Sequence, residues 1–453
     1  MLFSSLTFLL YFLPAVLVIH YFLPRRAQNL FLLIASIIFY AWGEAKYVPL
    51  IIALLLINFA LGRLLSVPSL SILNRKILLF LSVFVDIGVL IYYKYAAFLL
   101  SLFGGAFQAP NVTLPLGISF FTFQLVAYLI DVSKASVEAE KNPIDLGAFI
   151  LLFPQLIAGP IIRYADMRPA LHQRRRPSSG ELQNGMAKFI AGLALKVLIA
   201  NPLGEFHTTL LAVNPDMPGA WLSALAFGLQ IYFDFFGYSL MAIGIGKMLG
   251  FDIPINFDHP YAARSVREFW RRWHITLGNW FRDYVYIPLG GSRKGEARTL
   301  FNLFCVWSLT GLWHGAAVNF ILWGVYYFIL LALERSVLKR FLEKHPHIAH
   351  GYTLIAVFAG WILFSTDQMN RLPALFSALF SFSFLNDSVF YLRQYAVVLV
   401  AAILLCIPSF TSKLNALVSI NKVGQTAVML ALLLLCLCAL IRSSYNPFLY
   451  FRF

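Results

Sequence analysis

Two histidines stand out among the residues whose type and position could support chemistry. His314 lies near the middle of residues 299–333, a run that contains no Asp, Glu, Lys or Arg. Ionisable side chains are costly inside long apolar segments, so each one is a candidate functional group. A neutral imidazole facing a cavity is suited to take a proton from a substrate hydroxyl. A lone histidine on an apolar helix also commonly serves as a packing group, and that alternative stays open.

His274 and Asp234 are the other two candidates. His274 ends the sequence Trp270-Arg271-Arg272-Trp273-His274, whose arginines could hold a phosphate-bearing donor. The alternative is a membrane-surface residue among arginines that bind lipid headgroups. Asp234 lies in the aromatic segment 232–239. A buried carboxylate needs a partner, and we expect a cytoplasmic arginine or a histidine.

The remaining ionisable residues of the apolar segments have simpler interpretations. They lie near the expected ends of spans, where structural pairing is typical: His20, Asp86, Asp131 and Glu334. Three histidines in the Pro-containing linker 345–350 have no Cys nearby, and the four cysteines all sit in apolar stretches without metal-binding spacing. We therefore predict no metal site and no bound cofactor.

The elements that carry these residues are too apolar for a soluble protein. Of the 453 residues 60% are hydrophobic and only 12% are charged, about half the usual charged fraction of soluble domains. This composition also excludes a disordered chain, collagen, a coiled coil and a disulfide-rich mini-protein. At about 20 residues per crossing, the apolar segments predict roughly 11 to 13 transmembrane helices. These segments are 6–23, 29–43, 47–65, 76–100, 112–130, 146–162, 187–211, 220–249, 299–333, 352–366, 395–410 and 424–441.

The uncharged run 299–333 poses a geometric problem. As one straight helix it would be about 52 Å long, whereas the hydrocarbon core of a bilayer is about 30 Å thick. Gly311, Gly315 and Asn319 cluster where a break would fall. Broken backbone at membrane depth must be buried in protein or line a cavity, so we expect His314 to face a cavity.

The charge balance predicts the orientation in the membrane. The net charge is +15, and two short segments, 163–177 and 262–298, carry +4 and +5 of it. No long soluble basic domain exists to bind nucleic acid, and excess Lys and Arg in short loops marks the cytoplasmic side. Placing the basic loops there puts the N-terminus outside. The first 24 residues lack charge and a cleavage site, so we expect a retained first span.

The basic segment 262–298 also has helical periodicity. Its apolar residues from Val266 to Tyr284 recur every three or four positions, and Arg264, Arg267 and Arg271 lie largely off that stripe. An amphipathic helix in the headgroup plane has this pattern. An ordinary surface helix packed on the bundle has it equally, and the two interpretations do not exclude each other.

Six segments together resemble the membrane-bound O-acyltransferase family, most of all its bacterial branch that acetylates polysaccharides. They are LPLGISFFTFQ, FPQLIAGPIIR, YFDFFGYS, FWRRWHITLGNWFRDYVYIPLGGSRKG, GLWHGAAVNFILWG and the closing NPFLYFRF, in this order. The resemblance runs from the first span to the last residue and implies one polytopic domain over 1–453. It implies a ring of helices, with interfacial amphipathic helices, around a central tunnel across the membrane.

The resemblance also implies an enzyme and its active residues. The histidine of the Trp-His-Gly motif, here His314, corresponds to the catalytic residue, and His274 to the second functional histidine. The donor would be a cytoplasmic acyl thioester such as acetyl-CoA. The acceptor would be a hydroxyl of an extracytoplasmic polysaccharide such as alginate, reached directly or through a periplasmic O-acetyltransferase. The expected location is the bacterial inner membrane.

Further substrate-binding residues follow from the chemistry. Asn319 or nearby backbone N–H groups would stabilise the oxyanion, and Asp234 is a further candidate for substrate binding. Basic side chains would hold the phosphates of the donor: Arg267, Arg271, Arg272, Arg293 and Lys294. Relatives in the acetylating branch usually have FDFSGYSDMAIG, where this chain has Phe236 and Leu240, which leaves the acceptor open.

Two other functions are alternatives. One is D-alanyl transfer to teichoic acid by a related enzyme. The other, from a different class, is a transporter or flippase without bond chemistry. Transporters typically show paired halves or several intramembrane charge pairs, and the sequence shows neither, which favours an acyltransferase.

Overall fold

The computed structural model of the chain describes residues 1–101, 113–157, 159–173, 176–212, 216–366, 369–381, 386–419, 421–442 and 449. Over these residues the regular structure is helical, and the pairing of Phe257 with Trp273 is an isolated bridge. The predicted all-α class is therefore confirmed. The contacts divide the chain into two compact units, which are described separately: Met1–Phe189 with Ser239–Pro254, and Ile190–Tyr238 with Ile255–Phe453. One polytopic domain over the whole chain stays a prediction.

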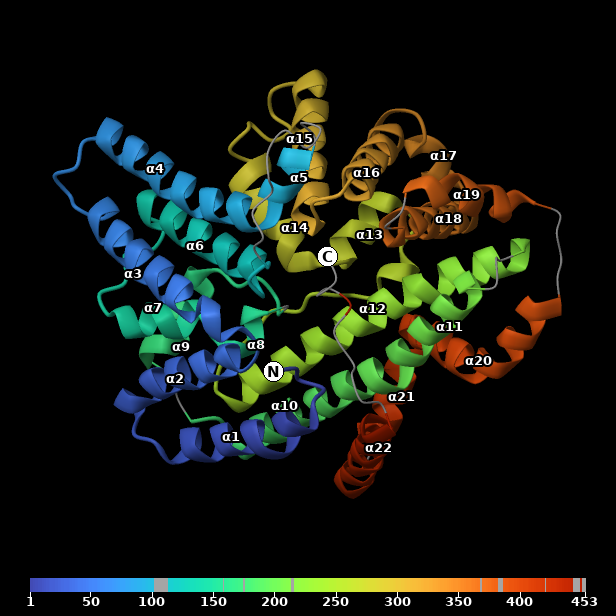
Figure 1. Cartoon of the computed structure of the whole chain (residues 1–453), viewed down its shortest axis with the longest axis horizontal. Coiled ribbons are helices and arrows are strands. Elements are labelled where there is room, and N and C mark those ends of the chain that lie inside the picture. The colour runs from blue at the N-terminus through green and yellow to red at the C-terminus, as the bar shows by residue number, and fades with distance from the viewer. Residues whose placement is uncertain are drawn as a thin grey trace. The chain divides into compact units, whose positions relative to one another are not determined.

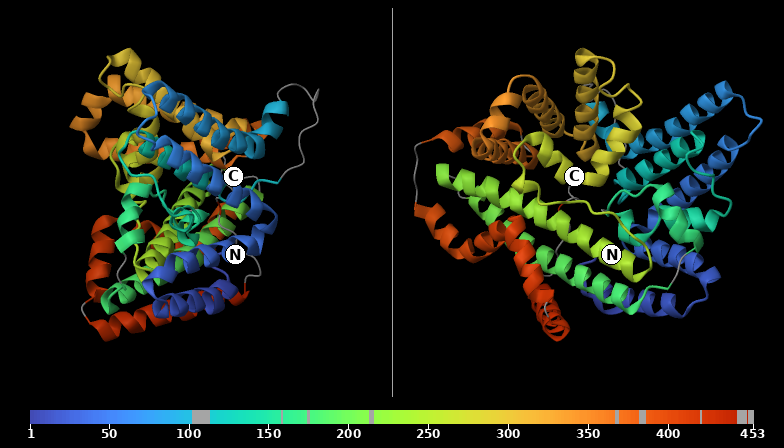
Figure 2. Two further views of the ribbon diagram at one scale, coloured as in Figure 1. Left: turned by 90° about the vertical axis from the view of Figure 1, so that its left-hand side faces the viewer. Right: turned by 180° about the vertical axis from the view of Figure 1, so that it is seen from behind.

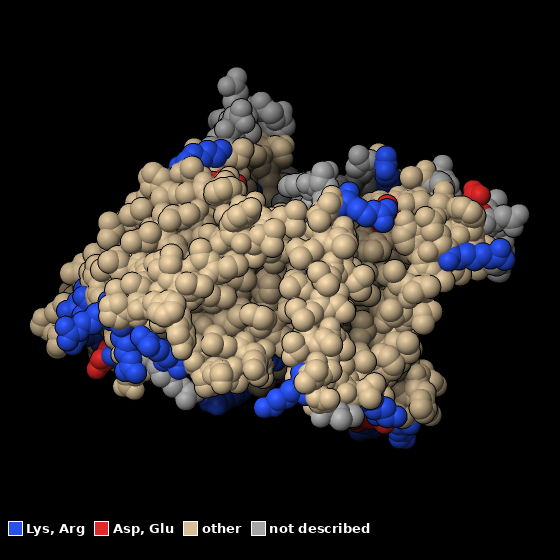
Figure 3. Space-filling model, turned by 90° about the horizontal axis from the view of Figure 1, so that it is seen from below, with Lys and Arg blue, Asp and Glu red and all other residues tan. Residues whose placement is uncertain are grey.

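The surface of the molecule is that of a multi-pass membrane protein. Among the described residues, eight helices are long and apolar enough to cross a membrane, and Phe8–Phe22 and Ile118–Ser133 are shorter apolar helices. Large apolar side chains point outward on several of the long ones, for example Phe80 and Phe84, which are 68% and 65% exposed. Lys and Arg lie at the margins of the face drawn in Figure 3, and uncharged residues cover the area between them.

The first unit contains the N-terminal helices, of which α3, α4 and α6 pack side by side (Figures 1 and 2). Its elements are η1 (Phe8–Phe12), α1 (Leu13–Phe22), α2 (Arg25–Glu44), η2 (Ala45–Tyr47), α3 (Val48–Leu65), α4 (Ile72–Leu90), η3 (Ile91–Tyr95), α5 (Ala96–Ser101), α6 (Ile118–Ser133), α7 (Pro143–Ile150), α8 (Phe153–Leu156) and α9 (Tyr164–Gln173). Two helices, α10 (Ser179–Ala194) and α12 (Met217–Met248), contribute residues to both units.

One apolar segment of this unit is not a membrane span. We expected residues 146–162 to be one crossing. They contain the end of α7 and the four-residue α8, and each of these helices has a proline in its first turn. Leu146, Phe149 and Phe153 are completely buried. The segment is apolar because it is enclosed by protein, and hydropathy does not distinguish that environment from lipid.

The second unit contains the candidate histidines. Its elements after α10 are η4 (Leu195–Ala200), α11 (Asn201–Ala212), η5 (Pro260–Ala262), α13 (Val266–Arg272), α14 (Ile275–Phe281), η6 (Arg282–Tyr286), α15 (Glu296–His314), α16 (Val318–Ser336), α17 (Lys339–Lys344), α18 (Pro346–Ser365), η7 (Met369–Arg371), α19 (Leu372–Phe380), α20 (Asn386–Leu405), α21 (Pro408–Ser419) and α22 (Lys422–Arg442).

The long uncharged run breaks where the geometry required it. Helix α15 ends at His314, Gly315 is extended, and α16 begins at Val318. At 19 residues, α15 is about 28 Å long, so the break resolves the length problem. The two helices pack closely (Figure 1), because Gly311 lies against the carbonyl of Phe320 and Gly324 against that of Trp307. A Cβ atom at either glycine would collide with that carbonyl.

The amphipathic segment differs from the expected single helix. It forms two seven-residue helices, α13 and α14, separated by His274 in a left-handed conformation with φ 44°. Its apolar stripe faces the protein, and Phe269, Trp273 and Leu277 are buried. The packed helix fits the burial of this stripe, and a position in the headgroup plane, which packing does not exclude, stays a prediction.

Candidate active site

His274 is held at a fixed place by its backbone. The chain next to it pairs with residues 256–258: Asp258 N–H donates to the Arg272 carbonyl and Ile275 N–H to the Asn256 carbonyl, each at 3.0 Å. Ser265 begins α13 by accepting a hydrogen bond from Glu268 N–H. A non-glycine residue with positive φ is uncommon, and these contacts on both sides hold His274 there.

The His274 ring is buried among three neighbouring side chains, Asn256, Phe235 and Trp313. Its Nδ1 lies 3.1 Å from Asn256 Oδ1. Its ring meets Phe235 edge to face at 4.7 Å between centroids and Trp313 at 5.8 Å. Only 2% of the residue is exposed. His274 lies between α13 and α14, outside the candidate membrane-spanning helices. Burial lowers the pKa of its side chain to about 3, so the imidazole is neutral at ordinary pH.

His314 lies at the C-terminal end of α15, in an aromatic enclosure. Its ring is 5.0 Å from Trp323, 5.2 Å from Phe364 and 5.0 Å from its neighbour Trp313. Because Trp313 also contacts His274, one indole ring links the two histidines. The structure thus brings together two residues that are 40 positions apart in the sequence and that were both predicted as functional.

Asp234 is paired, but with a residue that the sequence interpretation missed. Lys196 Nζ lies 2.5 Å from Asp234 Oδ1, and Leu449 N–H donates to Oδ2 at 2.7 Å. The expected arginine or histidine partner was therefore wrong. Lys196 lies in η4, a π-helical turn, against which Gly237 of α12 packs closely. The same cost of a buried charge that singled out Asp234 applies to Lys196 in its apolar segment, so that signal was available.

The other predicted binding residues divide into two groups. Asn319 and Arg272 bind other groups of the protein: buried Asn319 Nδ2 donates to the Phe364 carbonyl at 3.1 Å, and half-buried Arg272 pairs with Glu268 at 2.9 Å. The other basic side chains are exposed: Arg267, Arg271, Arg293 and Lys294. Arg174 and Arg175 of the first basic segment, and all of NPFLYFRF except Leu449, lie outside the described residues.

Three of the residues interpreted as structural, Glu334, Asp86 and His20, have contacts that connect elements. Glu334 accepts from Val266 N–H at 2.6 Å and from Arg267 N–H at 3.0 Å, which ties α16 to the start of α13. Asp86 accepts from Asn58 Nδ2 at 2.8 Å. The backbone carbonyl of His20 accepts from Gln28 Nε2. These contacts connect elements and suggest no further chemistry.

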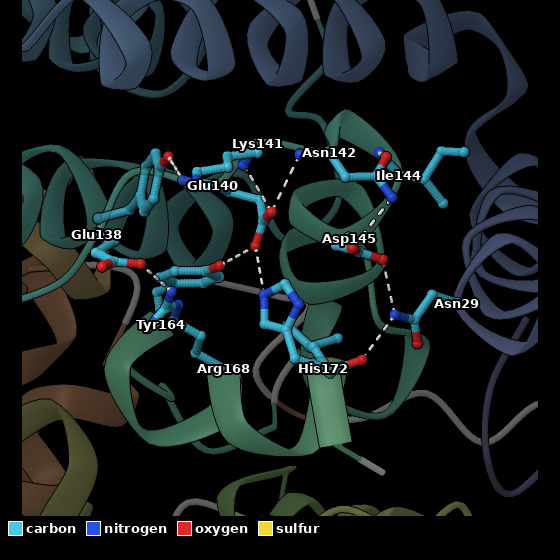
Figure 4. A network of polar contacts seen from close by, with 12 residues as sticks. Asn29, Glu138, Glu140, Lys141, Asn142, Ile144, Asp145, Tyr164, Arg168 and His172 are labelled. Carbon is cyan, nitrogen blue, oxygen red and sulfur yellow. Dashed lines mark hydrogen bonds and ion pairs between the residues drawn. The ribbon is translucent and has the colours of Figure 1, made fainter. Parts of the chain in front are cut away.

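A second polar network, in the first unit, was not predicted (Figure 4). Glu140 accepts from Lys141 N–H at 2.7 Å and Asn142 N–H at 3.0 Å, from the Tyr164 hydroxyl, and from His172 Nε2 at 2.9 Å. Burial favours a higher pKa for Glu140, but the hydrogen bonds, first that from Tyr164, outweigh it and lower the pKa.

Metal binding by this network conflicts with its hydrogen bonds. Donor atoms of Glu140, Asp145 and His172 lie within 4.8 Å of one another, a spacing that a metal ion could use. A carboxylate offers about four lone-pair sites, and the four contacts of Glu140 already use them. Asp145 accepts two hydrogen bonds, from Asn29 at 2.7 Å and from Asn142 at 3.1 Å. The network connects the start of α7 to α9.

Comparison with known proteins adds to this geometry. The model of the membrane-bound O-acyltransferase family matches residues 141–366. The chain is 37% identical, over the full length of both proteins, to a probable alginate O-acetylase AlgI of Pseudomonas putida. It is 33% identical to a peptidoglycan O-acetyltransferase of Helicobacter pylori, over 82% of this chain and 78% of the relative. It is 29% identical to a teichoic acid D-alanyltransferase of Bacillus subtilis, over 48% of this chain and 58% of the relative.

Proposed function

Because the chain belongs to the membrane-bound O-acyltransferase family, we propose that it transfers an acetyl group from a cytoplasmic thioester to an extracytoplasmic polysaccharide. The observation that carries this proposal is the buried pair of His274 and His314, linked through the Trp313 ring. Both histidines belong to the second unit, which shields them from bulk water. A dry site with a neutral imidazole suits acyl transfer, since it disfavours hydrolysis of the thioester.

The reaction needs one proton to move. A hydroxyl oxygen of the acceptor attacks the acyl carbon, a C–O bond forms and the C–S bond breaks. His314 takes the hydroxyl proton and returns it to the departing sulfur, so that ester and free thiol are the products. Backbone N–H groups beside Gly315, or the second N–H of Asn319, stabilise the tetrahedral oxyanion.

The donor enters from the basic side in this proposal. Acetyl-CoA, or another acyl thioester, approaches the cytoplasmic face of the inner membrane, where Arg267, Arg271, Arg293 and Lys294 are exposed to hold its phosphates. Arg272 contributes less, because Glu268 and Asp258 already neutralise it. No cofactor or metal is required, since the donor supplies the activated acyl group.

The acceptor is a polysaccharide, reached directly or through a periplasmic O-acetyltransferase. Support comes from the relatives, since the named alginate and peptidoglycan O-acetylating proteins match over most of the chain. D-alanyl transfer is favoured less, because that relative matches over only 48% of the chain. A flippase without bond chemistry is favoured least, given that all these relatives carry transferase or acetylase names.

Acetyl content of the exported glycan tests the proposal. We expect His314→Ala and His274→Ala, expressed in a deletion strain of the host bacterium, to lower glycan acetylation by about 10²-fold or more, the usual contribution of acid–base assistance. His347→Ala, a change at an exposed histidine, is the matched control and should leave acetylation unchanged. Normal acetylation by a His314→Ala variant present in the membrane at wild-type amounts would refute the catalytic role.

A further inference from the structure

The hydrogen bonds of Asn256 determine which way its side chain points. Its Oδ1 atom lies 3.2 Å from Thr276 N, 2.9 Å from Thr276 Oγ1 and 3.1 Å from His274 Nδ1. A backbone N–H only donates, so the atom that faces Thr276 N must be the amide oxygen and not the amide nitrogen. Asn256 is 1% exposed, and water therefore does not compete for this oxygen.

This orientation specifies the protonation of the histidine ring. A carbonyl-type oxygen can only accept hydrogen bonds, so Nδ1 of His274 must carry the hydrogen that it shares with Asn256. In a neutral imidazole the other nitrogen, Nε2, then keeps its lone pair. Because burial holds His274 neutral well below ordinary pH, the choice between the two tautomers persists under all working conditions.

The free nitrogen lies inside the aromatic enclosure. His274 Nε2 is buried and has no hydrogen-bond partner among the residues that the structure describes. The neighbouring rings are Phe235 and Trp313, and Trp313 is the ring that also contacts His314. A buried acceptor without a partner is costly, about 1–3 kcal/mol, and such groups are typical of sites that receive a substrate donor.

We propose that Asn256 is a positioning residue that fixes the tautomer of His274 and so keeps the Nε2 lone pair available to an N–H or O–H group of the substrate. This inference rests on the proposed function of His274. Backbone geometry supports it independently, because the Asn256 carbonyl also accepts from Ile275 N–H at 3.0 Å. The main chain of Asn256 therefore fixes the position of His274. The side chain of Asn256 determines which ring nitrogen of His274 carries the hydrogen.

Three variants separate this role from simple packing. Asn256→Leu has a similar volume but cannot accept the hydrogen bond. Asn256→Asp keeps two acceptor oxygens for the same donors. Thr276→Val is the matched control, because it removes another hydrogen bond to the same oxygen and leaves the contact of Asn256 with Nδ1.

The tautomer is measured directly. Nitrogen NMR of the full-length protein in lipid nanodiscs, with isotope-labelled histidine and His274→Gln to assign the signal, reports which ring nitrogen carries hydrogen. We expect hydrogen on Nδ1 in the wild type and in Thr276→Val, and a mixture or the opposite tautomer in Asn256→Leu. A folded Asn256→Leu protein with an unchanged His274 signal would overturn the proposal.

Activity is measured on the same samples with acetyl-CoA bearing a radioactive acetyl group as the probe. Asn256→Leu should lose at least about tenfold in transfer rate, and Thr276→Val should stay within about twofold. Asn256→Asp should recover most activity at alkaline pH. As the pH is lowered, Asn256→Asp should lose activity at a higher pH than the wild type does, because an adjacent carboxylate raises the pKa of the imidazole.

The two failures are distinguishable. A switched tautomer with full activity in Asn256→Leu would show that the hydrogen position does not serve the reaction, which overturns the positioning role. Full activity in His274→Ala would refute the proposed function of His274 itself, whatever the NMR shows for Asn256.

Discussion

Lys196 and Asp234 place opposite charges side by side where almost no water reaches them. Their side chains are 7% and 2% exposed, and the nitrogen and oxygen are 2.5 Å apart. Removing two ions from water is costly, and their attraction offsets that cost only while both are present. The second oxygen of Asp234 binds Leu449 N–H, so the pair also holds the described end of the chain.

Breaking this pair should destabilise the protein strongly. We expect Lys196→Met to lower the free energy of unfolding by about 3–5 kcal/mol, because it leaves an uncompensated buried carboxylate. Adding Asp234→Asn should restore much of that loss, since the amide is uncharged and still accepts from Leu449 N–H. Thermal unfolding of the detergent-purified variants measures both effects. A double variant as unstable as Lys196→Met alone would contradict this account.

The sequence identifies residues whose ionisable side chains are costly to bury in an apolar segment, because that segment can be recognised without the fold. His314 in an uncharged run, Asp234 among aromatics and His274 beside arginines were all predicted, and the structure places the three in one unit. Asn256 was not predicted, because an asparagine outside an apolar run carries no such signal. Its importance depends on a tertiary contact across 18 residues, which only the fold reveals.

At the scale of elements, the α15–α16 pair positions His314 through two glycines. Helix length alone predicted a break in residues 299–333, and the helices end and begin on either side of it. The break in the 264–284 segment was not predicted, since nothing in its helical periodicity marks His274 as left-handed. Contacts from residues 256–258 impose that conformation, and periodicity does not record contacts made by another segment.

The close packing of α15 on α16 predicts a large effect of one methyl group. Gly311→Ala places a Cβ against the Phe320 carbonyl, so we expect the helices to separate, with a loss of about 1–3 kcal/mol in stability. Displacement of His314 should lower glycan acetylation by about tenfold or more, because catalysis is sensitive to shifts near 1 Å. Acetyl analysis and thermal unfolding together measure this.

A glycine in an open position provides the control. Nothing lies within 4 Å of a Cβ atom built on Gly351 of α18. Gly351→Ala should leave acetylation unchanged and stabilise the helix slightly, by up to about 1 kcal/mol. Equal behaviour of the Gly311→Ala and Gly351→Ala variants would show that the α15–α16 contact does not position the site.

At the scale of the whole molecule, the distribution of charge predicts how the chain lies in the membrane. Basic residues concentrate in short segments between apolar helices, and such segments stay in the cytoplasm. Under this rule the connections of the first spans lie on alternating sides of the membrane. The connection with Arg25 and Arg26 lies inside, and the connection between α2 and α3 lies outside. The connection between α3 and α4, beside Arg63 and Arg75, lies inside again.

Single cysteines test this orientation. In a variant whose four native cysteines are replaced, we expect Ala45→Cys to react with a membrane-impermeant maleimide added to intact spheroplasts. Ser69→Cys and Arg293→Cys should react only after the membrane is opened, because the positive-inside rule puts them in the cytoplasm. All three positions are exposed in the structure, so accessibility reports the side of the membrane rather than burial. Labelling of Arg293→Cys from outside would invert the orientation and, with it, the side from which the proposed donor enters.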